Sequence, residues 1–408
     1  MLRVEEVPLA QLKLNDRNPR TIRSARFRQL RRTIVAEREL LEVRSVIVRL
    51  SNNMVLAGNQ RVRAAIAEGW ETIPAAFMDV DDARAARIMF LDNASFGEND
   101  DDLVAELLAE LQAAGGDLDL TGFARAETEA LLRKLAFRDR DADALPVVNR
   151  KKPKTMPGEL VELGPHRLLC GDATNPEHVR LLVGDAEPTL IATDPPYGVE
   201  LDNTWRERAG LNRRRGTRTP AHETTSLAAD ERADWSEAFA LMPSVIVAYV
   251  WHASRYACVV QAGLERAGFE VRQQLVWDKG AFALSRQAYH WAHEPCMYAI
   301  KQGASAPWYG TRNQATIWRA PSPKMVSAGN GDATDTKVDH ATQKPVALFT
   351  RPIENHLEPG EWVYDAFGGS GTSLIAAELT GRRALVMEID PRCCDLVRAR
   401  YAEFVGGR

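Results

Sequence analysis

Four consecutive residues, Asp194-Pro195-Pro196-Tyr197, have the composition needed to bind the amino group of a flat heterocyclic ring. They end the apolar run TLIATD, which is typical of a buried strand. Two prolines fix the backbone and remove two N–H donors, so the Asp194 carboxylate and the Pro195 carbonyl remain as acceptors in a rigid frame. Tyr197 offers an aromatic face for stacking. Hydrogen bonds accepted from an exocyclic –NH2 free its lone pair, so the pattern predicts chemistry at that nitrogen.

A glycine-rich loop near the C-terminus has the composition of a nucleoside-binding site. The apolar run WVYDAF leads through Asp365 into the loop 367–371 (FGGSG), and a helical stretch follows. Glycines let a backbone approach a ligand closely. An acid about 20 residues beyond such a loop can hold ribose hydroxyls, and Glu388 lies 19 residues after Gly369. The third glycine of the dinucleotide pattern is replaced by Leu374 and the P-loop lysine is missing, which favours a nucleoside without a pyrophosphate over NAD or ATP.

Together these two segments resemble the DNA amino methyltransferases that use S-adenosylmethionine and methylate adenine N6 or cytosine N4. The DPPY segment precedes the glycine loop, and ATQKPVALFTRPI (341–353) stands just before that loop. This order resembles the β group of these enzymes, which is a circular permutation of the common sheet. The resemblance covers roughly residues 157–405.

The resemblance implies a role for each matching residue. Asp194, Pro195 and Tyr197 would hold the target base and its amino group, while Pro196 shapes the turn. Direct transfer to the amine of a flipped-out base would need no covalent intermediate. The cofactor would be S-adenosylmethionine, with Asp172 at its adenine and Glu388 at its ribose. Asp365 and the backbone from Phe367 through Gly369 to Gly371 would bind its methionine part. Lys344, in the stretch Thr342-Gln343-Lys344, would meet its carboxylate.

Other methyl-transfer reactions fit these residues less well. Asp at position 194 favours adenine N6 over cytosine N4. Protein-glutamine methyltransferases carry Asn there, and cytosine-C5 enzymes use a Pro-Cys nucleophile, for which Pro295-Cys296 at the start of an apolar strand is a poor match. A non-catalytic scaffold on a ParB-like DNA-binding protein, or a methyltransferase of RNA or protein, stays open.

A basic segment at 204–220 follows DPPY and is suited to phosphate contacts with double-stranded DNA. The length up to 340 corresponds to the family's target recognition region. No metal site is expected, although His290, His293 and Glu294 come closest to a ligand spacing. The expected DNA-binding residues are Arg206, Arg208, Arg213, Arg214, Arg215 and Arg218.

The N-terminal part resembles the ParB-like N-terminal domain over about residues 5–90. Its marks are Asn18-Pro19-Arg20 and the box Gly58-Asn59-Gln60-Arg61, which departs from the family's G-E-R-R. The departure leaves open whether this part binds CTP or DNA. No helix-turn-helix is evident in the sequence.

These residues must be positioned by strands and helices that alternate in the C-terminal half. Seven strand-like runs (RLLCG, TLIATD, SVIVAYVW, VRQQLVW, CMYAI, WVYDAF, RALVMEI) have helical stretches between several of them. This alternation predicts an α/β fold with a doubly wound, mostly parallel sheet of the S-adenosylmethionine-dependent methyltransferase type, preceded by a small α+β domain. The expected domains are 1–137 (ParB-like, with a helical extension), 138–157 (linker) and 158–408 (methyltransferase, with the basic loop and recognition region in 204–340).

Composition sets the remaining limits. The 408 residues are 45% apolar and 26% charged, and the formal charge is −4, which excludes a uniformly basic coat. Five cysteines without CxxC spacing argue against a disulfide framework. The N-terminus lacks the apolar core of a signal peptide, and the longest apolar runs are too short to span a membrane. A cytoplasmic enzyme is expected. Relatives of the β group are often dimers, which implies a homodimer, and no restriction partner can be named.

Overall fold

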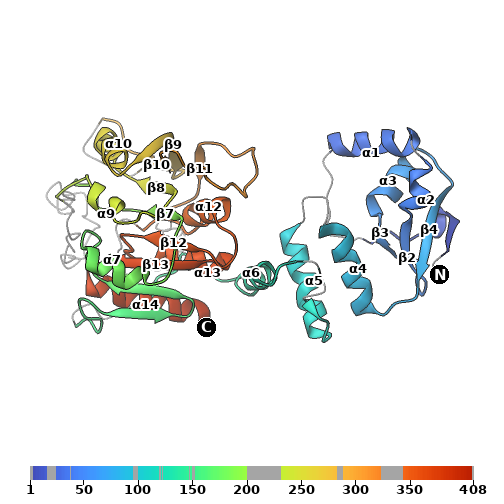
Figure 1. The fold of residues 1–408 in the computed structure, drawn as a ribbon, viewed down its shortest axis with the longest axis horizontal. Helices are drawn as coiled ribbons and strands as arrows, with labels where there is room; N and C mark the ends of the chain where they lie inside the picture. The colour runs from blue at the N-terminus through green and yellow to red at the C-terminus, as the bar shows by residue number, and fades with distance from the viewer. Residues whose placement is uncertain are drawn as a thin grey trace, which may run out of the picture. The chain divides into compact units, whose positions relative to one another are not determined.

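The computed structural model describes residues 3–15, 24–36, 38–94, 100–118, 121, 123–146, 148, 152–199, 231–282, 288–322 and 343–406. The chain divides into two compact units, Met1–Arg138 and Asp139–Arg408 (Figure 1). The division lies inside 138–157, the segment that the sequence predicts as a linker. The arginines of 204–220 and Asn18-Pro19-Arg20 lie outside the described residues, as does Thr342.

The first unit contains a four-stranded sheet in the order β1-β4-β2-β3. Strands β2 and β3 are antiparallel and form the hairpin that the two apolar runs around 51–53 predict. Strand β4 joins β1 antiparallel and β2 parallel. The strands are β1 (Val4–Pro8), β2 (Val46–Arg49), β3 (Val55–Ala57) and β4 (Thr72–Met78).

Helices of the first unit fall into two groups. The first group lies with the sheet and comprises η1 (Leu9–Gln11), α1 (Ser24–Ala36), α2 (Leu40–Val43) and α3 (Asn59–Ala67). The second comprises α4 (Asp82–Ala94), α5 (Asp101–Ala113) and α6 (Arg125–Ala136), and has an apolar core of its own. Asp100 caps α5 by accepting a hydrogen bond from the backbone N–H of Leu103.

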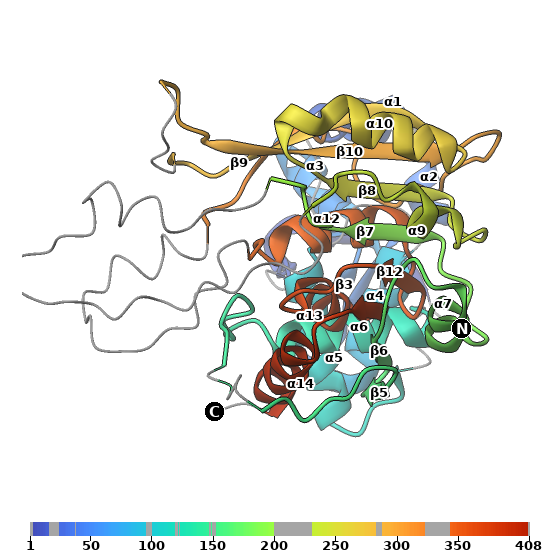
Figure 2. The ribbon, with the colours of Figure 1, turned by 90° about the vertical axis from the view of Figure 1, so that its left-hand side faces the viewer.

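The second unit is built on a nine-stranded sheet in the order β11-β9-β10-β8-β7-β12-β13-β6-β5. The five central strands β6, β13, β12, β7 and β8 are parallel, whereas β10 runs antiparallel between β8 and β9. Figure 2 shows β10, β8, β7 and β12 following one another across the sheet. The strands are β5 (Leu160–Leu163), β6 (His166–Cys170), β7 (Leu190–Thr193), β8 (Val247–Trp251), β9 (Phe269–Asp278), β10 (His293–Lys301), β11 (Ile317–Arg319), β12 (Trp362–Asp365) and β13 (Arg383–Glu388).

Helices cover both faces of this sheet. On one face α7, α9 and α10 pack on the core that holds Ile191, Val250 and Leu385, and α12 and α13 lie on the opposite face (Figure 1). The expected doubly wound, mostly parallel α/β fold is therefore confirmed. The helices are α7 (Pro176–Val183), α9 (Ser236–Ala240), η3 (Ser254–Tyr256), α10 (Ala257–Arg266), α12 (Ala347–His356), α13 (Thr372–Thr380) and α14 (Pro391–Gly406). Among the described residues no helix is long and apolar enough to cross a membrane.

Candidate active site

Four acidic residues follow four neighbouring parallel strands. Asp172 comes after β6, Glu388 ends β13, Asp365 ends β12, and Asp194 comes after β7. The strand order places them in that same sequence along one edge of the sheet. The carboxyl edge of an open parallel sheet is where ligands bind. Residues that the sequence scatters over more than 200 positions thus share one edge.

The glycine loop passes directly against strand β13. The backbone N–H of Gly368 donates to the Met387 carbonyl at 2.8 Å. A Cβ at position 368 would lie 2.3 Å from the Val386 side chain, so only glycine permits this approach. Gly371 caps helix α13 in the left-handed conformation, with φ of 78°. Beside Gly369 the space is open, because an added Cβ would meet nothing within 4 Å.

Asp365 fixes the start of this loop through hydrogen bonds to its side chain. Its side chain is only 2% exposed and accepts hydrogen bonds from Thr193 Oγ1 at 2.6 Å, Ser373 Oγ at 2.5 Å and the backbone N–H of Phe367 at 3.1 Å. Burial raises the pKa of Asp365 to about 6, against the effect of these hydrogen bonds. Both oxygens are therefore engaged by the protein, and the residue positions the loop that the sequence predicts as a cofactor site.

Glu388 faces the open side of the same loop. Its Oε2 accepts from the Gly369 N–H at 2.7 Å and its Oε1 from the Asp390 N–H at 2.8 Å. Burial raises the pKa of Glu388 to about 7. At the next strand, Asp172 accepts hydrogen bonds from the backbone and the hydroxyl of Thr174, both at 2.8 Å. The predicted ribose residue thus contacts Gly369 directly, and the predicted adenine residue follows the neighbouring strand.

Lys344 lies at the DPPY segment. Its Nζ is 2.6 Å from Asp194 Oδ2, 2.9 Å from the Tyr197 hydroxyl and 3.0 Å from Glu294 Oε2. The Tyr197 hydroxyl in turn donates to Asp194 Oδ1 at 2.7 Å. Lys344 was expected at the cofactor carboxylate, and the structure instead brings it to the predicted catalytic residues. The sequence singled out Glu294 only as a weak metal-ligand candidate, whereas here Lys279 also forms an ion pair with it.

Charges in this cluster perturb one another. Burial raises the pKa of Asp194, and the Lys344 ammonium partly offsets that rise while Glu294 adds to it. Burial would also raise the pKa of Glu294, but Lys344 and Lys279 outweigh it and hold that pKa at about 2. Burial favours neutral Lys344, yet the two carboxylates outweigh that effect and raise its pKa. The buried charges of Asp194, Lys344 and Glu294 therefore stabilise one another, with the cation between the two carboxylates.

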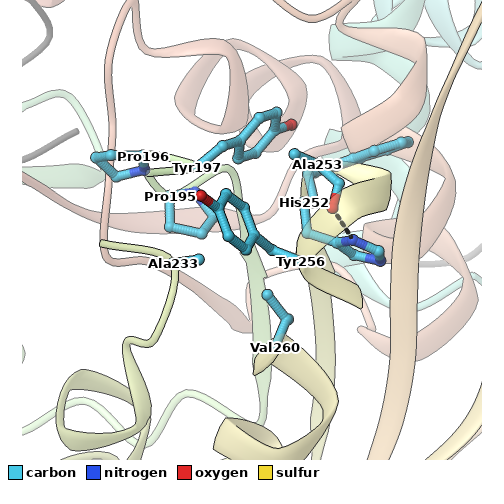
Figure 3. A pocket seen from close by; sticks show the side chains of 9 residues that line it. Pro195, Pro196, Tyr197, Ala233, His252, Ala253, Tyr256 and Val260 are labelled. Carbon is cyan, nitrogen blue, oxygen red and sulfur yellow. Dashed lines mark hydrogen bonds between the residues drawn. The ribbon is translucent and has the colours of Figure 1, made fainter. Parts of the chain in front are cut away.

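A pocket opens next to Pro195 and Tyr197 (Figure 3). The Pro196 carbonyl accepts a hydrogen bond from Trp235 Nε1 at 3.0 Å, which fixes the turn. No described residue donates a hydrogen bond to the Pro195 carbonyl. Other lining residues come from the end of β8, from η3 and α10, and from the chain before α9: Trp251, His252, Ala253, Tyr256, Val260 and Ala233.

Cys296 and two tryptophans near the DPPY segment lie on strands of the sheet. Cys296 is 0% exposed on β10, and burial raises the pKa of its thiol well above the ordinary value, which opposes nucleophilic chemistry. Trp277 is 2% exposed and donates to the Ala320 carbonyl at 2.7 Å. Trp251, by contrast, lines the pocket while remaining 2% exposed.

Residues 189–399 match the model of a DNA methylase family. The chain belongs to this DNA methylase family. The match spans both DPPY and the glycine loop, which confirms the family assignment made from these segments. Residues 1–94 match a ParB N-terminal domain, in agreement with the resemblance seen there.

A ParB-methyltransferase helix-turn-helix domain matches residues 102–157. This motif was not evident in the sequence. Helices α5 and α6 fall within the match and pack against each other. The helical extension expected in 1–137 contains both helices, but no residue pattern between them indicated the motif.

The methylase is similar to several known proteins. It is 26% identical over 167 residues to the type II methyltransferase M2.MboI of Moraxella bovis, covering 38% of this chain and 59% of the relative. It is also 26% identical over 208 residues to the putative methylase YubD of Escherichia coli K12, covering 49% of this chain and 75% of that protein. A crystal structure of an M1.HpyAVI–SAM complex is 19% identical, covers 57% of this chain and 98% of the other, and gives a TM-score of 0.40.

Proposed function

We propose that this methylase transfers a methyl group from S-adenosylmethionine to the exocyclic amine of a flipped-out base in double-stranded DNA, with adenine N6 as the target. The observation that carries the proposal is the position of Asp194 and of the Pro195 carbonyl, which accepts no hydrogen bond from a described residue, beside Tyr197 and one strand away from the glycine loop. Such a pair of acceptors fits an –NH2 group on a planar ring. Family membership supports DNA as the substrate class.

The chain's residues fit the cofactor along the carboxyl edge. Glu388 presents a carboxylate to the open space beside Gly369, as a ribose diol requires. Asp172 lies one strand further along, where the adenine would bind. Phe367 is packed 4.7 Å from the Trp235 ring and so holds the loop toward the pocket. When bound, S-adenosylmethionine supplies a methyl group on a sulfonium, whose S–C bond breaks as the N–C bond forms.

The residues at DPPY would carry the rest of the reaction. Asp194 and the Pro195 carbonyl accept the two N–H bonds of the amine, which directs the nitrogen lone pair toward the cofactor. The nitrogen gains positive charge in the transition state, so these hydrogen bonds strengthen as the reaction proceeds. One N–H proton is lost from the nitrogen, and the Asp194 carboxylate that accepts this N–H is placed to receive it.

The choice of adenine rests on the Asp that opens the segment, and cytosine N4 is the alternative product. Phosphate contacts are assigned to the arginines of 204–220 by their sequence composition, and each contact would add to a salt-dependent affinity. The affinity for DNA should therefore fall as the salt concentration rises. The fall should be less steep after these arginines are replaced.

Transfer of a radiolabelled methyl group from S-adenosylmethionine to unmethylated genomic DNA tests the proposal, followed by nucleoside mass spectrometry. N6-methyldeoxyadenosine is expected, and it should disappear in Asp194→Ala while cofactor binding persists. Detection of N4-methyldeoxycytidine in its place would show that cytosine, not adenine, is the target. A matched control is Asp185→Ala, since this residue is exposed and its carboxylate forms a surface ion pair with Arg167. Cofactor binding without incorporation into any DNA would refute the proposed reaction.

A further inference from the structure

The Lys344 ammonium lies between two carboxylates in the interior of the site. The side chain is 3% exposed, with Asp194 Oδ2 at 2.6 Å and Glu294 Oε2 at 3.0 Å. An isolated buried charge is strongly unfavourable, so the two carboxylates account for its presence there. Glu294 comes from the start of β10, which is antiparallel to its neighbours and so begins at the edge where the parallel strands end.

Both oxygens of Asp194 already accept hydrogen bonds from the chain. Tyr197 donates to Oδ1 and Lys344 donates to Oδ2. A target amine must also donate to one of these oxygens if it is bound as proposed. Lys344 donates to Asp194 Oδ2, an oxygen that a target amine could also use, and it has a second carboxylate within 3.0 Å to which it can remain paired.

Resting on the proposed amine methylation, we propose that Lys344 is an internal substitute for the target amine, which occupies Asp194 in the free enzyme and is retained by Glu294 when the base enters. Lys344 and Glu294 are then positioning residues. Lys344 keeps Asp194 ionised and oriented before the base arrives. Glu294 is the second carboxylate with which Lys344 stays paired when the target amine replaces Lys344 at Asp194.

Lys344 and Glu294 act on the pKa of Asp194 in opposite directions. Removing the cation of Lys344 raises the pKa of Asp194, whereas removing the anion of Glu294 lowers it. The two variants therefore shift the acid limb of the activity profile in opposite directions. The charged and titratable groups that face Asp194 are Lys344 before α12, Glu294 (with Lys279 behind it) and Cys296 on β10, Tyr197 after β7 and Asp365 on β12.

The kinetic test compares Lys344→Met and Glu294→Gln with wild type, using kcat for methyl transfer as a function of pH. The acid limb should move up by about 1–3 pH units in Lys344→Met and down in Glu294→Gln. Melting curves and cofactor titrations establish that both variants are folded. Lys301→Met is the matched control, because Lys301 ends the same strand β10 and donates to the Ala267 carbonyl, and its profile should match wild type.

A second measurement does not depend on activity. NMR titration of the protein labelled with ¹³Cγ-aspartate gives the pKa of Asp194 directly, with the resonance assigned by Asp194→Asn. Opposite shifts in the two variants would support the inference even if wild type methylated no DNA, an outcome that would refute only the proposed function. Unchanged pKa values, or shifts in the same direction, would show that Lys344 and Glu294 do not control Asp194.

Discussion

The carboxylate of Asp143 accepts a hydrogen bond at 2.8 Å from the backbone N–H of Val346, two residues after Lys344. The Asp143 carbonyl also accepts from Gln343 Nε2 at 2.9 Å. The start of the second unit thereby holds both ends of the short segment that carries Lys344. Close by, Arg400 donates to the Ala142 carbonyl at 2.8 Å and to the Ser370 carbonyl at 3.0 Å. Residues just after the domain division therefore brace both the lysine segment and the glycine loop.

Replacing Asp143 should destabilise the second unit. Asp143→Ala leaves the N–H of Val346, a residue that is 3% exposed, without its acceptor. It also removes a carboxylate whose charge favours the buried Arg400. A buried unsatisfied donor costs about 1–3 kcal/mol, and the free energy of unfolding should fall by that amount. Chemical denaturation measures it, with exposed Asp185→Ala as control, and an unchanged midpoint would show that this brace is unimportant.

Replacing Asp365 should weaken cofactor binding by loosening the glycine loop that it holds. Asp365→Asn keeps the shape of the side chain but turns one acceptor into a donor, which then faces the hydroxyl of Thr193 or Ser373. The hydroxyls can rotate, so Asn should be milder than Asp365→Ala, which loses all three hydrogen bonds. Calorimetric titration with S-adenosylmethionine should give affinities in the order wild type, Asn, Ala. Equal affinity in all three would mean that the loop does not depend on this carboxylate.

The sequence predicts the layout of this site better than its contacts. Strand runs ending in Asp194, Asp365 and Glu388 were visible because buried parallel strands are continuously apolar and their acids stand out. The parallel order then places these acids on one edge. The edge strands β5 and β11 were missed, since they are partly exposed and lack the continuous apolar run that marks a buried strand.

The role of Glu294 could not be predicted from local pattern. It depends on the register of β10 against β8, where Cys296 pairs with Trp251, and on Lys344 arriving from a segment 50 residues later. The sequence placed Lys344 at the cofactor carboxylate. Its contact with Asp194 could not be predicted, because the partner of a lysine depends on tertiary packing and not on its sequence neighbours. The one available signal was Glu294 itself, a single acid at the start of an otherwise apolar strand.

Cofactor affinity should depend on pH through Glu388. Its pKa is raised from 4.5 to about 7 in the folded protein, and hydroxyl donors of a ribose favour its ionised form. Affinity should therefore increase as pH rises from about 6 to 8. The same shift means that the folded protein binds a proton more tightly than the unfolded chain, so this group's contribution to stability falls as pH rises from 4.5 to 7. Glu388→Gln should bind the cofactor more weakly, and its affinity should no longer depend on pH in this range. A pH dependence that persists in this variant would belong to another group.

Gly368 should tolerate no side chain. A Cβ there would lie 2.3 Å from Val386 Cγ1 and 3.3 Å from the Met387 carbonyl, so Gly368→Ala must displace the loop from β13. Overpacking of this kind costs about 1–3 kcal/mol. The displacement would also lengthen the hydrogen bond from Gly369 to Glu388, so cofactor affinity should fall together with stability. Gly406→Ala at the end of α14 is the matched control, since its Cβ meets nothing within 4 Å. A Gly368→Ala protein with wild-type melting and cofactor affinity would show that β13 yields at Val386, and that the close approach of loop and strand is not required for binding.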